Sequence, residues 1–240
     1  MQPRHWLTSE DCGATPCKSA QAALRPRGRS YRVVKRLLDF VLSLIALTVL
    51  SPCFALIAVL IRLDSPGPAI FRQIRVGKGG KEFSCYKFRS MVHNADQTVY
   101  ERFLKEVMRG DANSEKGKDQ PFRLKMGSDD PRVTQLGRWL RVTSLDELPQ
   151  LLNVIKGDMS LVGPRPDVPL SVEAYGPFER RRLAVLPGIT GLWQVSGRAR
   201  LTVRDMFELD ARYVEQCSLW MDLKILLRTI PAVITTKGAA

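Results

Sequence analysis

The most prominent hydrophobic pattern in the sequence is a run from Phe40 to Ile61 in which no side chain is charged. A helix of about 22 residues would be about 33 Å long, enough to cross a bilayer core of about 30 Å. Ser51 and Pro52 fall near the middle of the run, where proline removes a backbone hydrogen bond and bends a helix. The pattern therefore predicts an element that enters a membrane.

Basic residues lie on both sides of this run. They are Arg32, Lys35 and Arg36 before it, and Arg62, Arg72, Arg75, Lys78 and Lys81 after it. Cationic flanks prefer the cytoplasmic side, and a single spanning helix could place only one of them there. A helix that enters, breaks at Ser51-Pro52 and returns would keep both flanks on one side. A spanning helix and a buried hairpin in a soluble core are the alternatives.

Residues 64–91 have the pattern of a turn followed by a β-hairpin, with the tip at the glycine-rich cluster from Gly77 to Gly80. On the second arm, aromatic residues alternate with Lys87 and Arg89, which predicts a cationic strand face. A charged strand face is often simply solvated, so the pattern alone leaves its role open.

Three other segments show little pattern. Residues 1–30 are polar and lack periodicity, which predicts a disordered basic tail. Residues 92–128 are highly charged, and apart from a short helix near 98–108 we expect a surface excursion there. Residues 231–240 are expected to form a C-terminal tail.

The C-terminal half predicts three helices and a tight loop. Residues 171–186 have the pattern of a basic amphipathic helix, and residues 203–216 that of another. Residues 186–198 contain several turn formers, which indicates a loop whose backbone approaches a ligand. The last helix, near 219–230, has an apolar side that can pack on the core or lie at a bilayer surface. Packing is the commoner outcome, so we expect it.

The stretch from Ser144 to Pro166 contains the candidate chemistry. Ser144 lies three residues before Glu147, which is the form of a capping box and predicts a helix start. Apolar residues recur at helical spacing in Leu148, Leu151, Leu152 and Ile155. Gly157 is placed to end this helix.

Two adjacent carboxylates, Asp146 and Glu147, fall in the first turn of this predicted helix. The positive end of the helix dipole stabilises negative charge there. A carboxylate that stays ionised beside bound anions or a metal ion can act as a nucleophile. The alternative is that both are ordinary first-turn acids.

Four basic residues are candidates for the same pocket: Lys87, Arg141, Arg165 and Arg198. Arg141 precedes Asp146 by five residues, close enough to act on the same pocket. Arg165 lies between Pro164 and Pro166, whose rings fix the backbone and suit the arginine to a bidentate grip on phosphate. A solvated loop arginine is the alternative.

The formal net charge of +13, from 37 Lys+Arg against 24 Asp+Glu, favours an anionic partner such as nucleic acid, anionic lipid or a phosphorylated substrate. The 5 cysteines include no C-x-x-C pair, which argues against a zinc site or a disulfide framework. The 2 histidines lie in polar surroundings, so the chemistry is expected to rest on carboxylates and cations. These groups suit phosphoryl transfer, with Mg²⁺ held by Asp146 or Glu147 and nucleotide phosphates.

The run from Ser144 to Pro166 resembles the signature of the bacterial sugar transferases, also called monotopic phosphoglycosyl transferases. The segments Ser-Pro-Gly-Pro after Asp64 and Tyr-Lys-Phe-Arg-Ser-Met from Tyr86 are similar to that family as well. The family has a re-entrant membrane hairpin with a Ser-Pro break, which favours a helix-break-helix over residues 31–63. We therefore expect an α+β, mostly helical fold: this hairpin plus a small cytosolic catalytic domain over 64–230 that contains the short β-hairpin.

The resemblance also implies a reaction. Asp146 would attack the β-phosphorus of a UDP-sugar, UMP would leave, and polyprenyl phosphate would take the phosphosugar from Asp146 in a ping-pong scheme. Glu147 would be a magnesium partner or helper. The cations around the phosphates would be Lys87, Arg141, Arg165 and Arg198. Further motif positions are Pro164, Pro166 and Asp210, the last without an assigned role.

These expectations place the protein on the cytoplasmic face of the bacterial inner membrane and leave a homodimer open. It would initiate synthesis of exopolysaccharide, capsule, O-antigen or a glycoconjugate. The segment Gly-Leu-Trp-Gln-Val-Ser-Gly-Arg is similar to that of members that use UDP-galactose or UDP-glucose. The alternative is a non-catalytic, membrane-tethered basic protein that binds nucleic acid or anionic lipid, whereas the enzyme interpretation has no nucleic-acid partner.

Overall fold

The computed structural model describes residues 28–94, 130–197 and 201–234 of the 240-residue chain. Almost all of the expected N-terminal tail and of the expected excursion over 92–128, including its short helix near 98–108, lies outside the described residues. Arg198 lies outside them too, so its place in the site stays a prediction.

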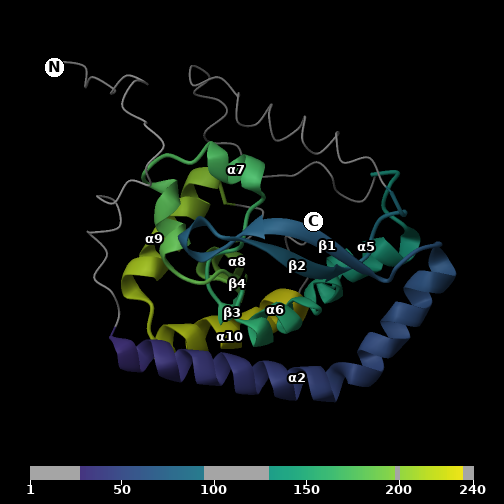
Figure 1. Ribbon diagram of the computed structural model, residues 1–240, viewed down its shortest axis with the longest axis horizontal. Helices are drawn as coiled ribbons and strands as arrows, with labels where there is room; N and C mark the ends of the chain where they lie inside the picture. The colour runs from purple at the N-terminus through teal and green to yellow at the C-terminus, as the bar shows by residue number, and fades with distance from the viewer. Residues whose placement is uncertain (1–27, 95–129, 198–200, 235–240) are drawn as a thin grey trace.

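The described chain is mostly helical, with one long N-terminal helix beside a small α+β unit (Figure 1). Helix α2 (Arg29–Asp64) leads into strand β1 (Ile70–Val76), the 3₁₀ turn η1 (Lys78–Gly80) and strand β2 (Glu82–Phe88). The second group is α5 (Gln135–Val142), η2 (Leu145–Glu147), α6 (Gln150–Lys156) and β3 (Ser160–Val162). The last group is α7 (Pro169–Glu173), η3 (Glu179–Ala184), β4 (Gly188–Thr190), α8 (Leu192–Ser196), α9 (Val203–Gln216) and α10 (Leu219–Ile234).

The predicted β-hairpin is confirmed. Strand β1 pairs antiparallel with β2, from Ile70 opposite Phe88 to Val76 opposite Glu82. The tip falls in the predicted glycine cluster, where two glycines have φ of 69° and 80°. Glycine occupies this left-handed region at little cost, which explains why the turn forms there. Strands β3 and β4 form a second, parallel pair.

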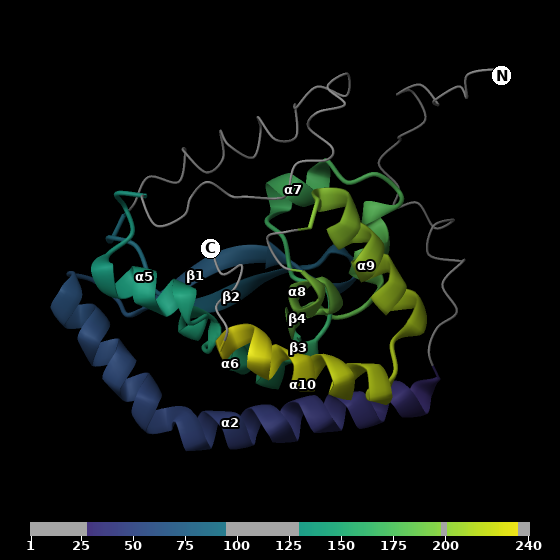
Figure 2. The same ribbon diagram turned by 180° about the vertical axis from the view of Figure 1, so that it is seen from behind.

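Helix α2 is continuous, which corrects the expected break at Ser51-Pro52. The helix bends partway along its length (Figures 1 and 2). Pro52 has no N–H to donate to the carbonyl of Thr48 one turn earlier, and the hydroxyl of Ser51 donates to that carbonyl at 2.8 Å. The proline accounts for the bend, and the serine keeps the freed carbonyl satisfied, so the helix continues through this pair.

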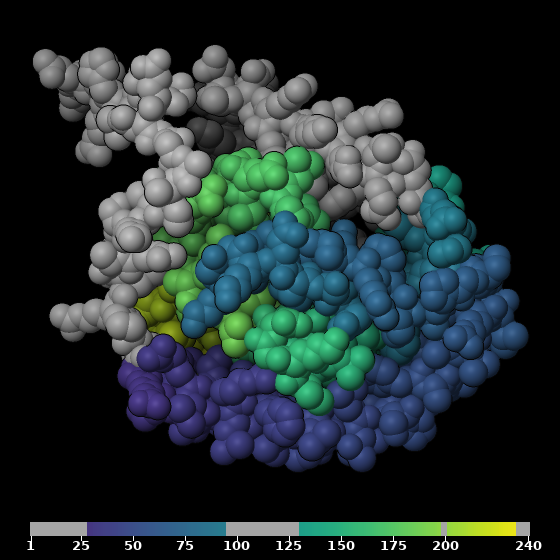
Figure 3. Space-filling view, viewed as in Figure 1, coloured from purple at the N-terminus to yellow at the C-terminus, as the bar shows by residue number. Residues whose placement is uncertain are grey.

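Most of the apolar surface of α2 is exposed. Its most apolar window has a mean hydropathy of 2.7, and 11% of that window is buried. Within the described ranges, α2 is the one helix long and apolar enough to cross a membrane. Its purple and blue residues form one edge of the molecule in the space-filling view (Figure 3). A helix in the core of a soluble protein would be mostly buried, so this exposure contradicts the soluble-core alternative.

Polar contacts attach the N-terminal half of α2 to the rest of the chain. The ammonium of Lys35 lies 2.9 Å from the carboxylate of Asp222 in α10. Arg36 donates to two backbone carbonyls at the end of α6. Asp39, 5% exposed, accepts a hydrogen bond of 3.1 Å from the backbone N–H of Leu161 in β3. Both ribbon views accordingly show α2 running along α6 and α10 (Figures 1 and 2).

The C-terminal half of α2 instead packs into an apolar core. Ile57 and Ile61 are 3% and 2% exposed and belong to one cluster with Phe88 and Leu140. Arg89, expected on the exposed cationic face of the hairpin, is buried and donates to three backbone carbonyls at and just beyond the end of α2. The expectation for Arg89 is therefore corrected, because its charge satisfies the carbonyl end of a helix.

The predicted helix over 171–186 is wrong, whereas the next one is confirmed. The chain forms two short elements, α7 and η3, with Gly176 and Pro177 between them. Proline disfavours helical backbone in the residue before it, which explains the interruption. Helix α9 has the predicted bounds, and its start is fixed by a capping box between Thr202 and Asp205.

Helix α10 extends to Ile234, so the predicted C-terminal tail begins later than residue 231. Its core side carries Asp222 and Ile225, which are 7% and 1% exposed. Four apolar side chains on the helix are 63%, 45%, 57% and 58% exposed, namely Trp220, Leu223, Leu227 and Ile230. The expectation that the apolar side packs on the core is therefore wrong for most of it, because hydrogen bonds from Tyr213 and Lys35 hold Asp222 in the core.

Asn153 in α6 brings the hairpin and the central stretch together. Its side chain is fully buried, accepts from the backbone N–H of Tyr86 at 3.0 Å and donates to the carbonyl of Ser84 at 2.7 Å. Both residues belong to β2, so α6 and the η2 turn before it lie against this strand. Lys87 is thereby placed beside η2.

Candidate active site

Asp146 and Glu147 lie in the η2 turn between α5 and α6, and the predicted capping box does not form. Ser144 has φ of 58° and ψ of 17°, and its side chain makes no cap hydrogen bond. An N-cap residue needs extended backbone, so left-handed Ser144 cannot fill that role. Helix α6 begins later, at Gln150, and its predicted end at Gly157 is confirmed by a φ of 93°.

Glu147 is held between two of the predicted cations. Its Oε1 lies 3.1 Å from Nζ of Lys87, and its Oε2 accepts from Nη1 of Arg165 at 3.0 Å. Nη2 of Arg165 also donates to Oε1, so the arginine grips the carboxylate in a bidentate manner. The structure therefore brings Lys87 and Arg165 together at Glu147, and their contact with phosphate stays a prediction.

These contacts give the two neighbouring carboxyl groups opposite pKa shifts. Burial disfavours the charged form of Glu147, but Arg165 and Lys87 outweigh it and hold the pKa of Glu147 well below its ordinary value. Burial and the charge of Glu147 raise the pKa of Asp146 to about 6, against the opposing effect of Lys87, Arg165 and Arg141. Asp146 is thus still ionised at neutral pH, but burial and the charge of Glu147 make the ionised form less favourable than in water.

Asp146 itself is uncommitted. None of the described residues gives its carboxylate a hydrogen bond or an ion pair, in contrast to the three contacts on Glu147. The nearby Arg141 is anchored through Nε, which donates to the hydroxyl of Ser90 at 2.9 Å. Burial lowers the pKa of Arg141, and the charge of Asp146 opposes that effect. As predicted, Arg141 therefore acts electrostatically on the pocket of Asp146.

Two other expected features lie away from this pair. Asp210 is 1% exposed in α9, and its carboxylate lies 2.7 Å from Nη2 of Arg182 rather than beside Asp146. In the glycine-rich loop over 186–198, a Cβ added to Gly188 would lie 2.1 Å from the backbone nitrogen of Gly163. The close packing expected of this loop is therefore between β4 and the segment after β3, and the approach of its backbone to a ligand stays a prediction.

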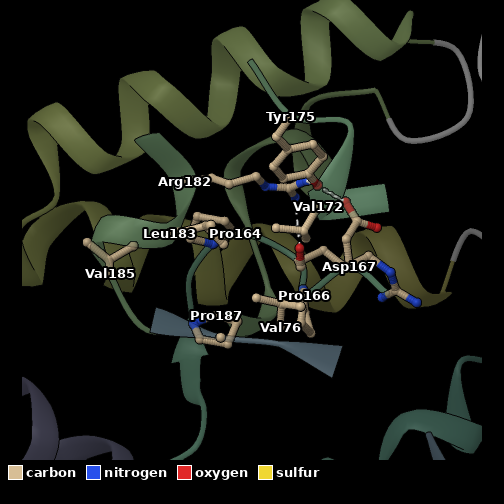
Figure 4. Close-up of a pocket in the computed structure, with 12 residues that line it drawn as sticks. Val76, Pro164, Pro166, Asp167, Val172, Tyr175, Arg182, Leu183, Val185 and Pro187 are labelled. Atoms are coloured by element: carbon tan, nitrogen blue, oxygen red, sulfur yellow. Dashed lines mark hydrogen bonds and ion pairs between the residues drawn. The ribbon is translucent and has the colours of Figure 1, made fainter. Parts of the chain in front are cut away.

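Sequence reasoning missed a buried polar cluster next to the site. Arg182, Asp167 and Tyr175 line one pocket with the backbone of Arg165 (Figure 4). Arg182 is one of three consecutive arginines, and nothing in that run distinguishes it from its less buried neighbours. The burial of Arg182 could not be predicted locally, because it depends on tertiary contacts with partners in distant segments of the chain.

The residues at the pair fit a magnesium ion only in part. Among the described residues, no group of three or more His, Cys, Asp or Glu side chains could hold a metal ion. Magnesium, however, is commonly held by one or two carboxylates together with substrate phosphates and water. The free oxygens of Asp146 meet that need, whereas both oxygens of Glu147 are occupied by Lys87 and Arg165.

Comparison with known proteins agrees with the resemblance carried by this stretch. The sequence profile described as "Bacterial sugar transferase" matches residues 30–236, which include all but the first residue of α2 and every described site residue. The chain belongs to the bacterial sugar transferase family. This sugar transferase is 44% identical over 211 residues to the undecaprenyl-phosphate galactose phosphotransferase of Salmonella typhimurium, covering 88% of this chain and 42% of that protein.

Other relatives of this sugar transferase differ in length. It is 40% identical to the exopolysaccharide production protein ExoY of Sinorhizobium fredii, covering 90% of this chain and 91% of ExoY. It is also 40% identical to the UDP-glucose:undecaprenyl-phosphate glucose-1-phosphate transferase of Caulobacter vibrioides, covering 90% of this chain and 77% of that protein. The chain spans less than half of the length of the Salmonella relative.

The raised pKa of Asp146 predicts that its charge destabilises the fold. Because the folded chain binds this proton more tightly, stability falls as pH rises from the ordinary pKa of 3.8 to about 6, and it stays lower above that range. Asp146→Asn mimics the protonated side chain, so we expect it to raise the free energy of unfolding by about 1–3 kcal/mol at neutral pH. The gain should shrink below pH ~6. Chemical unfolding across this pH range measures the difference.

Asp130 provides a control of opposite sign. A hydrogen bond from Arg132 is the main cause that lowers the pKa of Asp130, so its charge stabilises the fold. Asp130→Asn should therefore lower stability at neutral pH, where Asp146→Asn raises it. A stability loss at neutral pH in Asp146→Asn would contradict the electrostatic description of the pair.

Proposed function

We propose that the protein transfers a sugar 1-phosphate from a UDP-sugar to polyprenyl phosphate, such as undecaprenyl phosphate, with release of UMP. The observation that carries this proposal is the asymmetry of the acidic pair. Glu147 is neutralised by Lys87 and Arg165, while Asp146 is part-buried and has no hydrogen-bond or ion-pair partner among the described residues. A positioned, uncommitted carboxylate beside cations is suited to attack phosphorus.

In the first half-reaction, a carboxylate oxygen of Asp146 forms a bond to the β-phosphorus of the UDP-sugar. The bond from this phosphorus to the bridging oxygen breaks, and UMP leaves with that oxygen and its electron pair. The sugar phosphate is then linked covalently to Asp146. Negative charge on the phosphate oxygens is stabilised by the positive charges of Arg141, Lys87 and Arg165 around the pair.

In the second half-reaction, an oxygen of polyprenyl phosphate attacks the same phosphorus. The bond to Asp146 breaks, the carboxylate is regenerated, and the product is a polyprenyl diphospho-sugar. The fixed ion pairs of Glu147 keep Lys87 and Arg165 in place through both halves. One nucleophile thus serves a ping-pong scheme without a histidine base, because a carboxylate is already ionised at neutral pH.

We also propose Mg²⁺ as the cofactor, held by Asp146 and by phosphate oxygens of the donor. Glu147, the second expected ligand, would have to exchange contacts with Lys87 or Arg165 to take part. When bound, the ion would neutralise charge on the donor diphosphate. The protein's own residues provide the nucleophile and the fixed cations around it.

We propose the bacterial inner membrane as the location, with the catalytic residues on the cytoplasmic face. The bend in α2 would let the helix enter the bilayer and return, which keeps its basic flanks on one side. The exposed apolar side of α10, which runs along α2, would rest at the same surface. Polyprenyl phosphate is a membrane lipid, so this placement brings the acceptor to the site.

The names of the relatives suggest the sugars to test. The Salmonella and Caulobacter proteins are named for galactose and glucose transfer, and ExoY for exopolysaccharide production. We therefore favour UDP-galactose or UDP-glucose as the donor, and exopolysaccharide or a related surface glycan as the pathway that the reaction begins.

Release of UMP tests the proposed reaction. Wild-type protein in lipid nanodiscs should release UMP from UDP-galactose or UDP-glucose when Mg²⁺ and undecaprenyl phosphate are present, and chelation of Mg²⁺ should stop it. Asp146→Asn should lower the rate by at least about a thousandfold, because the amide is not a nucleophile of comparable strength.

The exposed residue Glu82 supplies a control, since Glu82→Gln changes a carboxylate near the tip of the hairpin, away from the acidic pair, and should leave the rate unchanged. Equal UMP release by wild type and Asp146→Asn would show that Asp146 is not the nucleophile. Salt-sensitive binding of nucleic acid or anionic lipid without UMP release would support the non-catalytic alternative instead.

Labelling of single cysteines tests the placement of α2. In a background with the native cysteines replaced, Ser30→Cys and Lys81→Cys place exposed thiols before and after the apolar run. The re-entrant placement predicts that an impermeant maleimide labels both from the cytoplasmic side of oriented vesicles. Labelling of the two positions from opposite sides would show that α2 spans the bilayer.

A further inference from the structure

A second ionic cluster, formed by Arg182, Asp167 and Asp210, contacts the segment that carries Arg165. Arg182 in η3 is 9% exposed and extends across this pocket towards Asp167 and Tyr175 (Figure 4). The proposed chemistry at Asp146 and Glu147 does not use it directly. A buried guanidinium is costly unless its charge and its N–H groups are satisfied, so the contacts of Arg182 indicate what it does.

Arg182 contacts three segments of the chain. Nη1 donates to Oδ2 of Asp167 at 2.6 Å and to the hydroxyl of Tyr175 at 2.8 Å. Nη2 donates to the backbone carbonyl of Arg165 at 2.8 Å. The guanidinium also lies 5.1 Å from the ring centroid of Phe207, within the range of a cation–π contact. Arg182 therefore fixes the backbone of the residue whose side chain grips Glu147.

Asp210 supplies the matching charge. It is 1% exposed, and its Oδ2 lies 2.7 Å from Nη2 of Arg182 as an ion pair without hydrogen-bond geometry. Without Asp210, the buried Arg182 would keep only Asp167 as a charged partner. This contact provides a role for Asp210 that does not require it to touch the substrate.

The rest of the segment is held as firmly as Arg165. The carbonyl of Pro164 accepts from the backbone of β4 at 2.9 Å, and the carbonyl of Pro166 accepts from a β1 side chain at 3.2 Å. The carbonyl of Asp167 accepts from the backbone at the end of β1 at 2.9 Å. Arg165 lies between two fixed proline rings, and Arg182 holds its carbonyl. These contacts leave the guanidinium of Arg165 a narrow range of positions.

We propose that Arg182 is a positioning residue for the sugar-phosphate transfer, with Asp210 as its counter-charge. It holds the backbone of Arg165 so that the Arg165 guanidinium stays on Glu147 beside the nucleophile. This inference rests on the proposed function for its consequence in catalysis. We call the contacts of Arg182 with the Arg165 segment the clamp. The clamp is a property of the fold and can be tested separately from catalysis.

Arg182→Lys tests the clamp, because one ammonium cannot replace a planar guanidinium that bridges three segments. Arg181→Lys is the matched control, since Arg181 is the part-exposed neighbour that pairs with Glu215. Hydrogen exchange measured by mass spectrometry over 160–175 should become faster in Arg182→Lys and stay unchanged in Arg181→Lys. Unchanged exchange in a folded Arg182→Lys protein would overturn the proposal.

UMP release tests the consequence. We expect Arg182→Lys to lower kcat by about 10–100-fold, with KM for the UDP-sugar changed by less than about 2-fold, because misplacement of Arg165 affects the transition state. In an Arg165→Lys background, the further loss caused by Arg182→Lys should shrink to less than about 3-fold. The same fold-loss in both backgrounds, or faster exchange with unchanged kcat, would overturn the positioning role.

Two further outcomes are decisive. If Arg182→Lys does not fold, Asp210→Asn removes the counter-charge at nearly constant volume and is judged by the same exchange and kcat criteria. If wild-type protein releases no UMP from any UDP-sugar, the proposed function fails. The exchange experiment then still decides whether Arg182 clamps the Arg165 segment.

Discussion

The carboxylate of Glu147, fixed between Lys87 and Arg165, is the contact on which the arrangement of the site depends. Two adjacent acidic side chains in a part-buried turn repel one another, and burial penalises both charges. Both direct ion pairs are made by only one of the two acids. One acid receives both cations and is strongly stabilised as an anion, while Asp146 has no direct partner among the described residues and a pKa of about 6.

This unequal division explains how a chemically simple residue can be reactive. A carboxylate locked in ion pairs is a poor nucleophile, because attack would have to break those contacts. An uncommitted carboxylate close to the same cations keeps its lone pairs available, and the cations remain positioned for phosphate oxygens. The ionised Asp146 lowers the stability of the fold, and the rest of the structure has to compensate for this loss. The site therefore depends on neighbouring structure to keep Lys87 and Arg165 in place.

Helix α2 and the site share structural elements. Strand β3 is tied to α2 through the contact between Asp39 and the N–H of Leu161, shortly before the segment that carries Arg165. Strand β2 carries Lys87 and is followed directly by Arg89, which binds the carbonyl end of α2. The two halves of the bent helix thus contact the two elements that supply cations to Glu147. Insertion of α2 in a bilayer would therefore set the position of the site relative to a lipid acceptor.

Local signals in the sequence predicted the hairpin with its glycine tip, the bounds of α9 and the end of α6 at Gly157. The motif also predicted that Lys87, Arg141 and Arg165 lie near the acidic pair. Features set by distant partners could not be predicted in this way: Ser144 adopts a left-handed conformation that excludes a cap, and Arg89 and Arg182 are buried by segments far away in the chain. Nothing in the charged pattern itself separates such residues from solvated ones.

In the proposed reaction, Asp146 becomes covalently attached to the sugar phosphate. This attachment can be measured by peptide mass spectrometry after rapid mixing with a UDP-sugar labelled in the sugar, in the absence of polyprenyl phosphate. We expect label on the peptide containing Asp146, formed together with UMP and removed when polyprenyl phosphate is added. Normal turnover in the presence of acceptor, with no adduct at position 146 on any timescale of the reaction, would contradict it.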